Sequence, residues 1–155
     1  MVDPSIAAFR EVLDESLDEL RRGISDLTVD ELNARPAGGD TNSIAVIVTH
    51  TFGATKSWLS LATGAPLPPR DRDAEFVAVA DDRFAAWTEE QIAACLGILH
   101  DGVKWDAGLV RTPDWNPRLA EEPRTAAYAV AHALEHVGEH AGHLHMTREL
   151  LRPSG

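Results

Sequence analysis

The stretch HALEHVGEHAGHLH, residues 132–145, decides how this sequence is interpreted. It holds five of the seven histidines in the chain. It lies in a segment that we expect to form one long helix, which begins at Pro123 and runs to about Leu151, before Pro153. The positions of its histidines can therefore be tested against helical geometry.

Most of these histidines fall on one face of the expected helix. At about 100° per residue, with His132 taken as zero, His136 lies at about 40° and His140 at about 80°. By the same measure, His143 lies at about 20° and Glu139 at about −20°. Four histidines thus form one narrow stripe, with Glu139 at its edge.

Two histidines four residues apart on a helix can hold one metal ion. This spacing occurs in His132/His136 and again in His136/His140, and spacing alone does not choose between the two pairs. Catalytic zinc usually has three protein ligands and one open position, so a third ligand is expected from a facing helix. His50 is the candidate, as the histidine of the second expected helix. The alternatives are a solvated polar face or a packed seam of hydrogen-bonded imidazoles.

Three more helices are expected upstream of this segment. The first starts at Pro4, because proline is favoured at the first helical position, and it runs to about Gly23. The second follows the cap residues 41–43 and stops at Gly64. The third is expected over residues 81–104, with an uncertain C-terminal boundary because glycines weaken its pattern.

The connections between these helices differ in length. Residues 28–32 resemble one short helical turn, residues 66–73 are too rich in proline for regular structure, and residues 113–117 form a second long connection. Strand signals are poor, and the best candidate is the short run 76–80. We therefore predict an all-α protein, an up-down four-helix bundle formed by a single domain over residues 1–155.

The charge balance argues against several classes of partner. With 14 Lys and Arg against 25 Asp and Glu, the formal charge is 14 − 25 = −11. A nucleic acid or an anionic membrane surface would repel such a protein, so we expect neither as a partner. No window holds 18 uninterrupted apolar residues, and no signal peptide is recognisable, so a cytoplasmic location is expected.

Cys95 is the single cysteine of the chain, so no intrachain disulfide can form. It lies in the apolar run IAACL, residues 92–96, with no nearby base to activate it. We interpret it as a buried small hydrophobic residue rather than as a nucleophile.

Three stretches of the chain carry a family resemblance: SIAVIVTH at 43–50, DRDAEF at 71–76 and HVGEHAGH at 136–143. With these stretches, essentially the whole chain resembles the DinB-like, or YfiT-like, superfamily of four-helix-bundle metalloproteins. The usual ligands of that superfamily are one histidine of the second helix and an i,i+4 pair of the fourth.

The resemblance implies that His50, His136 and His140 hold the metal ion, and so selects His136/His140 over the other pair. It also implies a homodimer. Many members have Arg-Gly-Gln after the last ligand, whereas this chain has Ala141-Gly142-His143, which leaves the role of His143 open. The role of His132 is open as well.

The superfamily includes enzymes that join a low-molecular-weight thiol to small electrophiles, so this activity is what the resemblance implies. The predicted cofactor is a divalent metal ion, zinc or nickel, since imidazole suits both. The thiol is a co-substrate, and the arginine-rich composition favours mycothiol over bacillithiol. Glu139 and His143 are the candidate catalytic residues, which would orient the thiol or move protons.

Two other functions remain open at this point. A three-histidine ion with an open position can equally activate water, which would make the protein a hydrolase. The bundle could also be a non-enzymatic, stress-response protein that binds metal.

Overall fold

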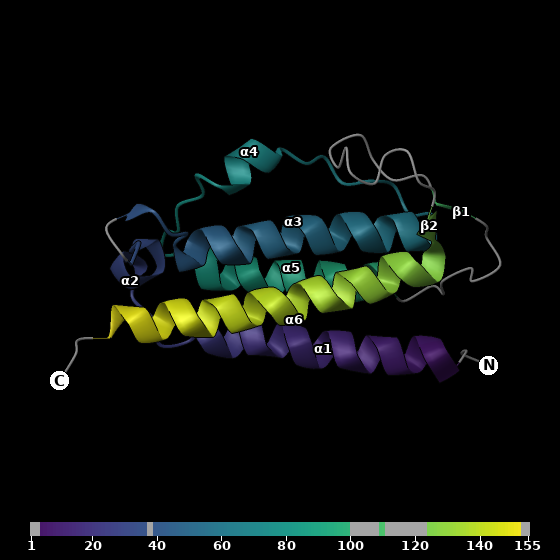
Figure 1. The fold of residues 1–155 in the computed structure, drawn as a ribbon, viewed down its shortest axis with the longest axis horizontal. Helices are drawn as coiled ribbons and strands as arrows, with labels where there is room; N and C mark the ends of the chain where they lie inside the picture. The colour runs from purple at the N-terminus through teal and green to yellow at the C-terminus, as the bar shows by residue number, and fades with distance from the viewer. Residues whose placement is uncertain (1–3, 37–38, 100–108, 111–123, 153–155) are drawn as a thin grey trace.

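Four long helices make up most of the described part of the protein (Figure 1). A computed structural model describes residues 4–36, 39–99, 109–110 and 124–152. The long helices are α1 (Pro4–Ile24), α3 (Ile44–Thr63), α5 (Phe84–Ile98) and α6 (Ala126–Leu151). Two short helices, α2 (Val29–Asn33) and α4 (Arg72–Glu75), lie in the connections, and β1 (Leu109–Val110) pairs antiparallel with β2 (Arg124–Thr125).

Local sequence signals explain where several helices begin and end. The Ser43 hydroxyl accepts a hydrogen bond from the backbone N–H of Val46 and caps α3. Gly64 ends the same helix with a positive φ of 75°, a conformation that glycine adopts without strain. Thr28 and Glu31 form a capping box at α2. The predicted second helix and the short turn before it are therefore confirmed.

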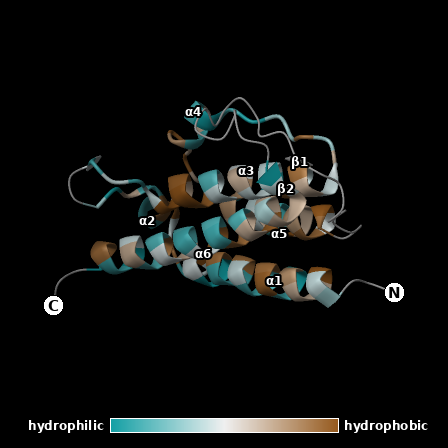
Figure 2. Cartoon of the chain, turned by 45° about the vertical axis from the view of Figure 1, so that its right-hand side comes forward, coloured by the Kyte–Doolittle hydropathy of each residue, from teal (hydrophilic) through white to brown (hydrophobic). Residues whose placement is uncertain are grey.

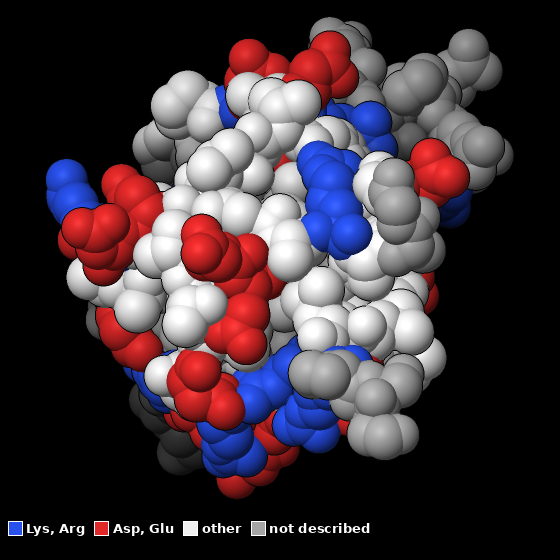
Figure 3. Space-filling model, turned by 90° about the vertical axis from the view of Figure 1, so that its left-hand side faces the viewer, with Lys and Arg blue, Asp and Glu red and all other residues white. Residues whose placement is uncertain are grey.

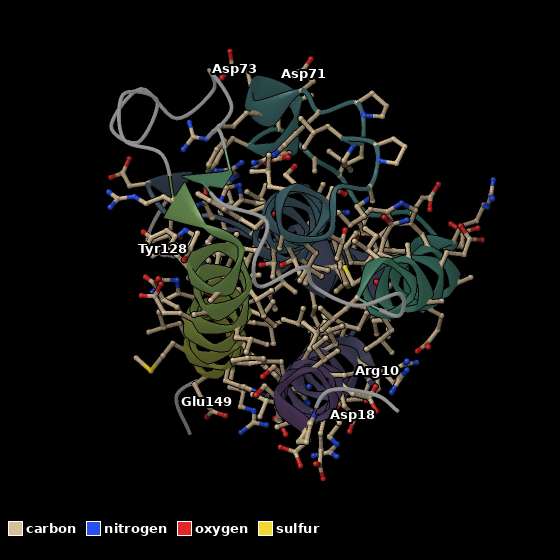
Figure 4. The ribbon with its side chains drawn as sticks, turned by 90° about the vertical axis from the view of Figure 1, so that its right-hand side faces the viewer. Arg10, Asp18, Asp71, Asp73, Tyr128 and Glu149 are labelled. Atoms are coloured by element: carbon tan, nitrogen blue, oxygen red, sulfur yellow. The ribbon has the colours of Figure 1, made fainter. Side chains whose placement is uncertain are left out.

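Each long helix packs against two others. The α3 helix packs on α6 and α5, and α1 packs on the same two helices. Figure 4 looks along the bundle and shows the four helices around a common core. The core includes Leu13, Leu17 and Leu20 of α1, Val48, Phe52 and Leu59 of α3, and Val130, Val137 and Leu144 of α6.

The all-α four-helix bundle is thus confirmed, and the structure adds the direction of each helix. The α3 and α5 helices run in the same direction, since Phe52 contacts Trp87 and Lys56 bonds to Gln91. The reason is the connection after Gly64, which passes through α4 and returns along the bundle before α5 begins (Figure 1). Strict alternation of direction is interrupted at this crossover.

Three local predictions need correction. The last helix begins at Ala126 rather than Pro123, because Thr125 is its N-cap and Arg124–Thr125 pair with β1. Residues 72–75 form the short α4 helix within the connection that was expected to lack regular structure, whereas residues 76–80 form no strand, in agreement with the poor strand signals. The third helix ends at Ile98, and most of its expected extension, like the 113–117 connection, lies outside the described residues.

The side of the molecule drawn in Figure 3 shows no continuous basic patch, and the basic side chains at its lower end lie among acidic ones. Figure 2 shows hydrophilic residues along the middle of the visible face of α6. No helix in the described part of the chain is long and apolar enough to cross a membrane.

Candidate metal centre

Three histidines from two helices meet between α3 and α6. The two helices run antiparallel, so the middle of α3 lies against the middle of α6 (Figure 1). The ring of His50 lies 5.2 Å from the ring of His136 and 5.2 Å from the ring of His140, measured between centroids. One ring nitrogen of each histidine lies within 4.8 Å of the others. We call these three residues the histidine triad.

The spacing of the α6 pair fits a metal ion. The Nε2 atoms of His136 and His140 lie 3.1 Å apart. With metal–nitrogen bonds of about 2.0–2.1 Å, two ligands of a tetrahedral ion lie about 3.3–3.4 Å apart. In addition, the Nδ1 atom of His136 is buried and has no hydrogen-bond partner among the described residues. A set of three imidazoles with this geometry is suited to a divalent cation.

Burial keeps the α6 pair in the form that a metal requires. Burial, together with neighbouring imidazoles, lowers the pKa of His136 from 6.5 to about 3. The same causes lower the pKa of His140 to about 4. Both rings are therefore neutral at pH 7, with a lone pair available on a nitrogen.

His143 and Glu139 lie on the solvent side of the triad. The Nδ1 atom of His143 lies 3.1 Å from Nδ1 of His140, and its Nε2 atom lies 3.9 Å from a carboxylate oxygen of Glu139. Both side chains are 55 % exposed. The structure therefore brings His143 next to the triad, whereas its contact with Glu139 is long and lies on the outer surface.

His132 does not join the triad, although it lies on the same stripe. Its ring meets the edge of Trp58 at 4.6 Å and stacks on Tyr128 at 5.8 Å, between centroids. Its Nδ1 atom lies 3.2 Å from a carboxylate oxygen of Glu135. The indole of Trp58 occupies the place across from His132 on α3, so no second imidazole meets it there.

Sequence reasoning missed two residues next to the triad, Arg70 and Glu75. A carboxylate oxygen of Glu75 lies 2.8 Å from Nδ1 of His50. Arg70 donates two hydrogen bonds to the same carboxylate, at 2.6 and 2.9 Å. Glu75 falls within the DRDAEF stretch, but the charges around it made a solvated linker the natural interpretation.

A cavity of about 420 Å³ opens beside the triad. We call it the triad pocket, since His50 and His140 line it together with His143. Its apolar wall consists of Val46, Ile47, Phe76, Met146 and Leu150, and residues 40–42 form a polar rim. A larger depression of about 580 Å³ over α1 is lined by residues 14–16, 18, 19, 21 and 22 and includes no triad residue.

Cys95 lies away from this chemistry. Its side chain is fully buried, and burial raises the pKa of its thiol to about 12. The thiol is therefore neutral at pH 7 and unreactive, which agrees with its interpretation as a small hydrophobic residue.

The fold and the site together define a four-helix bundle with a three-histidine candidate metal centre beside an open pocket. The sequence model of the mycothiol S-transferase family matches residues 8–153. The chain therefore belongs to the mycothiol S-transferase family, which confirms the resemblance to DinB-like proteins.

A solved structure supports the fold. The crystal structure of a conserved protein from Enterococcus faecalis superimposes with a TM-score of 0.69 at 19% sequence identity. The match covers 97% of this chain and 98% of that one. No functionally curated protein is similar enough to the chain to count as a match.

Proposed function

We propose that the protein is a metal-dependent S-transferase that joins mycothiol to small electrophiles. Two facts support this: the chain belongs to the mycothiol S-transferase family, and its histidine triad could hold a metal. The observation that carries the proposal is the convergence of His50, His136 and His140 beside the triad pocket. In the proposal, these three residues hold one divalent cation, zinc or nickel, with a coordination position left for the thiol.

A divalent cation at this place would favour the thiolate form of a bound thiol at neutral pH. His143 is the residue placed to take the released proton, because it lines the pocket, lies next to His140 and is half exposed. Glu139 would orient His143 from the outer side. The thiolate then attacks the electrophilic carbon, a carbon–sulfur bond forms, and the leaving group departs with its bonding electrons.

The triad pocket is where the proposal places the electrophile. Its wall is mostly apolar, and among its lining residues Asp40 is the one with a fixed charge. A carboxylate or sulfonate on the electrophile would find no arginine or lysine there. We therefore expect the pocket to favour electrophiles that carry apolar groups, with the proposed cation as the group that would attract an anionic one.

The test combines metal analysis with an activity assay. Protein purified without a histidine tag is analysed for bound metals, loaded with each candidate ion, and assayed for conjugation of mycothiol to monobromobimane or chlorodinitrobenzene. The expected result is conjugation that requires the metal and disappears in His50→Ala. His145→Ala is the matched control, since His145 is exposed and contacts Glu19 of α1 instead of the triad.

Two outcomes would redirect the proposal. Ester or amide cleavage that proceeds without any thiol would favour the hydrolase that a three-histidine ion can also support. Metal binding that stabilises the protein, with no turnover of mycothiol or any other cellular thiol, would favour a non-enzymatic metal-binding role. The cytoplasmic location and the homodimer stay predictions, and light scattering of the purified protein tests the second.

A further inference from the structure

Glu75 is a buried carboxylate in a mostly exposed segment. It is 6 % exposed, whereas Asp71 and Asp73 of the same segment are exposed. In Figure 4 the side chains of Asp71 and Asp73 point away from the bundle. Removing a carboxylate from water is costly unless charged and hydrogen-bonding partners compensate, so the partners of Glu75 indicate what it does.

Both oxygens of this carboxylate are held by Arg70. The Nε atom of Arg70 donates to Oε1 at 2.6 Å, and Nη2 donates to Oε2 at 2.9 Å. The Arg70 side chain is itself 6 % exposed. Burial acts to raise the pKa of Glu75, but the hydrogen bonds from Arg70 and His50 outweigh it and leave this pKa below the usual value. The bidentate pair fixes the carboxylate in one orientation.

The α3 helix is shaped to receive the pair. A Cβ atom at Gly53 would lie 2.1 Å from Oε1 of Glu75 and 3.3 Å from Nε of Arg70. Gly53 lies one turn beyond His50 on α3, so the missing side chain leaves room beside the His50 ring. Any larger residue at this position would push the carboxylate away from the helix.

The segment that carries Glu75 is also anchored farther along. Asn33 exchanges two hydrogen bonds with the backbone of Ala80, at 2.9 and 2.7 Å. The ring of Phe76 lies 5.0 Å from the ring of His50, between centroids. Glu75 therefore reaches His50 from a backbone that is anchored on its C-terminal side.

A carboxylate accepts hydrogen bonds, so the 2.8 Å contact requires that His50 donate from Nδ1. His50 then carries its proton on Nδ1, and Nε2 is the nitrogen left with a free lone pair. The other two triad histidines have no carboxylate partner of this kind among the described residues. His140 meets the half-exposed His143, and within the described part of the chain Nδ1 of His136 has no hydrogen-bond partner.

We propose that Arg70 and Glu75 are positioning residues that fix the tautomer and ring orientation of His50 and thereby set the metal affinity of the triad. The inference rests on the proposed metal site. A buried ion pair is a weak source of stability compared with well-packed apolar side chains. The hydrogen bond between Glu75 and His50 therefore indicates that the pair has a role in the site. Carboxylate partners of metal-bound histidines act in this way in other metal sites.

The experiment compares Glu75→Gln with the parent protein and with Asp73→Asn, which removes an exposed carboxylate from the same short helix. Zinc affinity is measured by competition with a chromophoric chelator, and the visible spectrum of cobalt-loaded protein reports the ligand geometry. We expect Glu75→Gln to bind zinc about 10- to 100-fold more weakly, with a changed cobalt spectrum. Asp73→Asn should match the parent. A parent-like affinity and spectrum in folded Glu75→Gln would overturn the inference.

A second readout needs no metal. Long-range ¹H–¹⁵N NMR of the metal-free protein distinguishes the two neutral tautomers of His50 and should show the Nδ1–H form in the parent. Glu75→Gln should show a mixture or the other tautomer, and an unchanged spectrum would contradict the inference. If the parent binds no metal, the proposed function fails, while the tautomer measurement still decides the role of Glu75.

Gly53→Ala provides a variant that keeps both charges. It displaces the carboxylate through steric contact alone, so it should weaken zinc binding in the same direction as Glu75→Gln. Should Glu75→Gln fail to fold, Gly53→Ala carries the test, and a parent-like zinc affinity in this variant would count against the inference.

Discussion

Two neighbouring turns of α6 use the same residue type differently. His136 faces His50 across the interface with α3 and approaches His140 at 3.1 Å. His132, one turn earlier on the same stripe, packs against the rings of Trp58 and Tyr128. The residue on the opposite helix makes the difference, because α3 presents an imidazole at one level and an indole two turns later. A histidine stripe thus becomes a candidate site only where the partner helix supplies a ligand.

The largest difference between the two turns of α6 should appear in the metal content of their histidine variants. His136→Ala removes one of the three members of the triad, so we expect it to lose nearly all bound metal after purification and dialysis. His132→Ala should retain the metal content of the parent, because its ring contacts Trp58 and Tyr128 instead. Elemental analysis of both variants checks this. Equal loss in the two would show that the stripe binds metal along its whole length.

The second prediction concerns pH. In the metal-free protein, burial holds the pKa of His136 at about 3 and that of His140 at about 4, against 6.5 for an unperturbed histidine. The unfolded chain therefore binds these protons first, so stability should fall as pH decreases from about 6.5 towards 4. Urea denaturation across this range measures the slope. The double variant His136→Gln/His140→Gln should show a smaller dependence of stability on pH. An identical dependence would contradict the low pKa values of these two histidines.

Metal addition should give a smaller, measurable stabilisation. A ligand at 100 times its Kd that binds the folded state alone adds about 2.7 kcal/mol. For a domain of this size, that corresponds to a rise in Tm of about 5–10 °C. Scanning calorimetry with and without zinc tests this. The rise should vanish in His50→Ala and persist in His132→Ala, whereas a rise that survives the loss of His50 would place the ion elsewhere.

The smallest effect should be on stability, at the turn of α6 that carries His132. His132→Ala removes a ring that meets Trp58 edge-on and stacks on Tyr128, so we expect a loss of about 1 kcal/mol in unfolding free energy. Chemical denaturation of the metal-free protein measures it. No loss of stability would mean that the ring is not a packing element and would reopen its role.

Local signals were enough to predict most of the fold. The Ser43 cap and the Gly64 stop act through their own backbone, so the bounds of α3 followed from neighbouring residues. Pro123 was a misleading start for α6, because Arg124 and Thr125 pair with residues 109–110 instead. That pairing is not local, and nothing in the residues around Pro123 indicates it.

The sequence by itself determined the helices, the histidine stripe and, through the family resemblance, the three residues of the triad. Their spacing is a local property of helices, which a sequence shows directly. Only the tertiary structure decided that Trp58 lies across from His132 and that Glu75 reaches His50. The packing of α3 against α6 sets the first, and the space over Gly53 sets the second. Both depend on contacts between residues far apart in the chain, which no local pattern encodes.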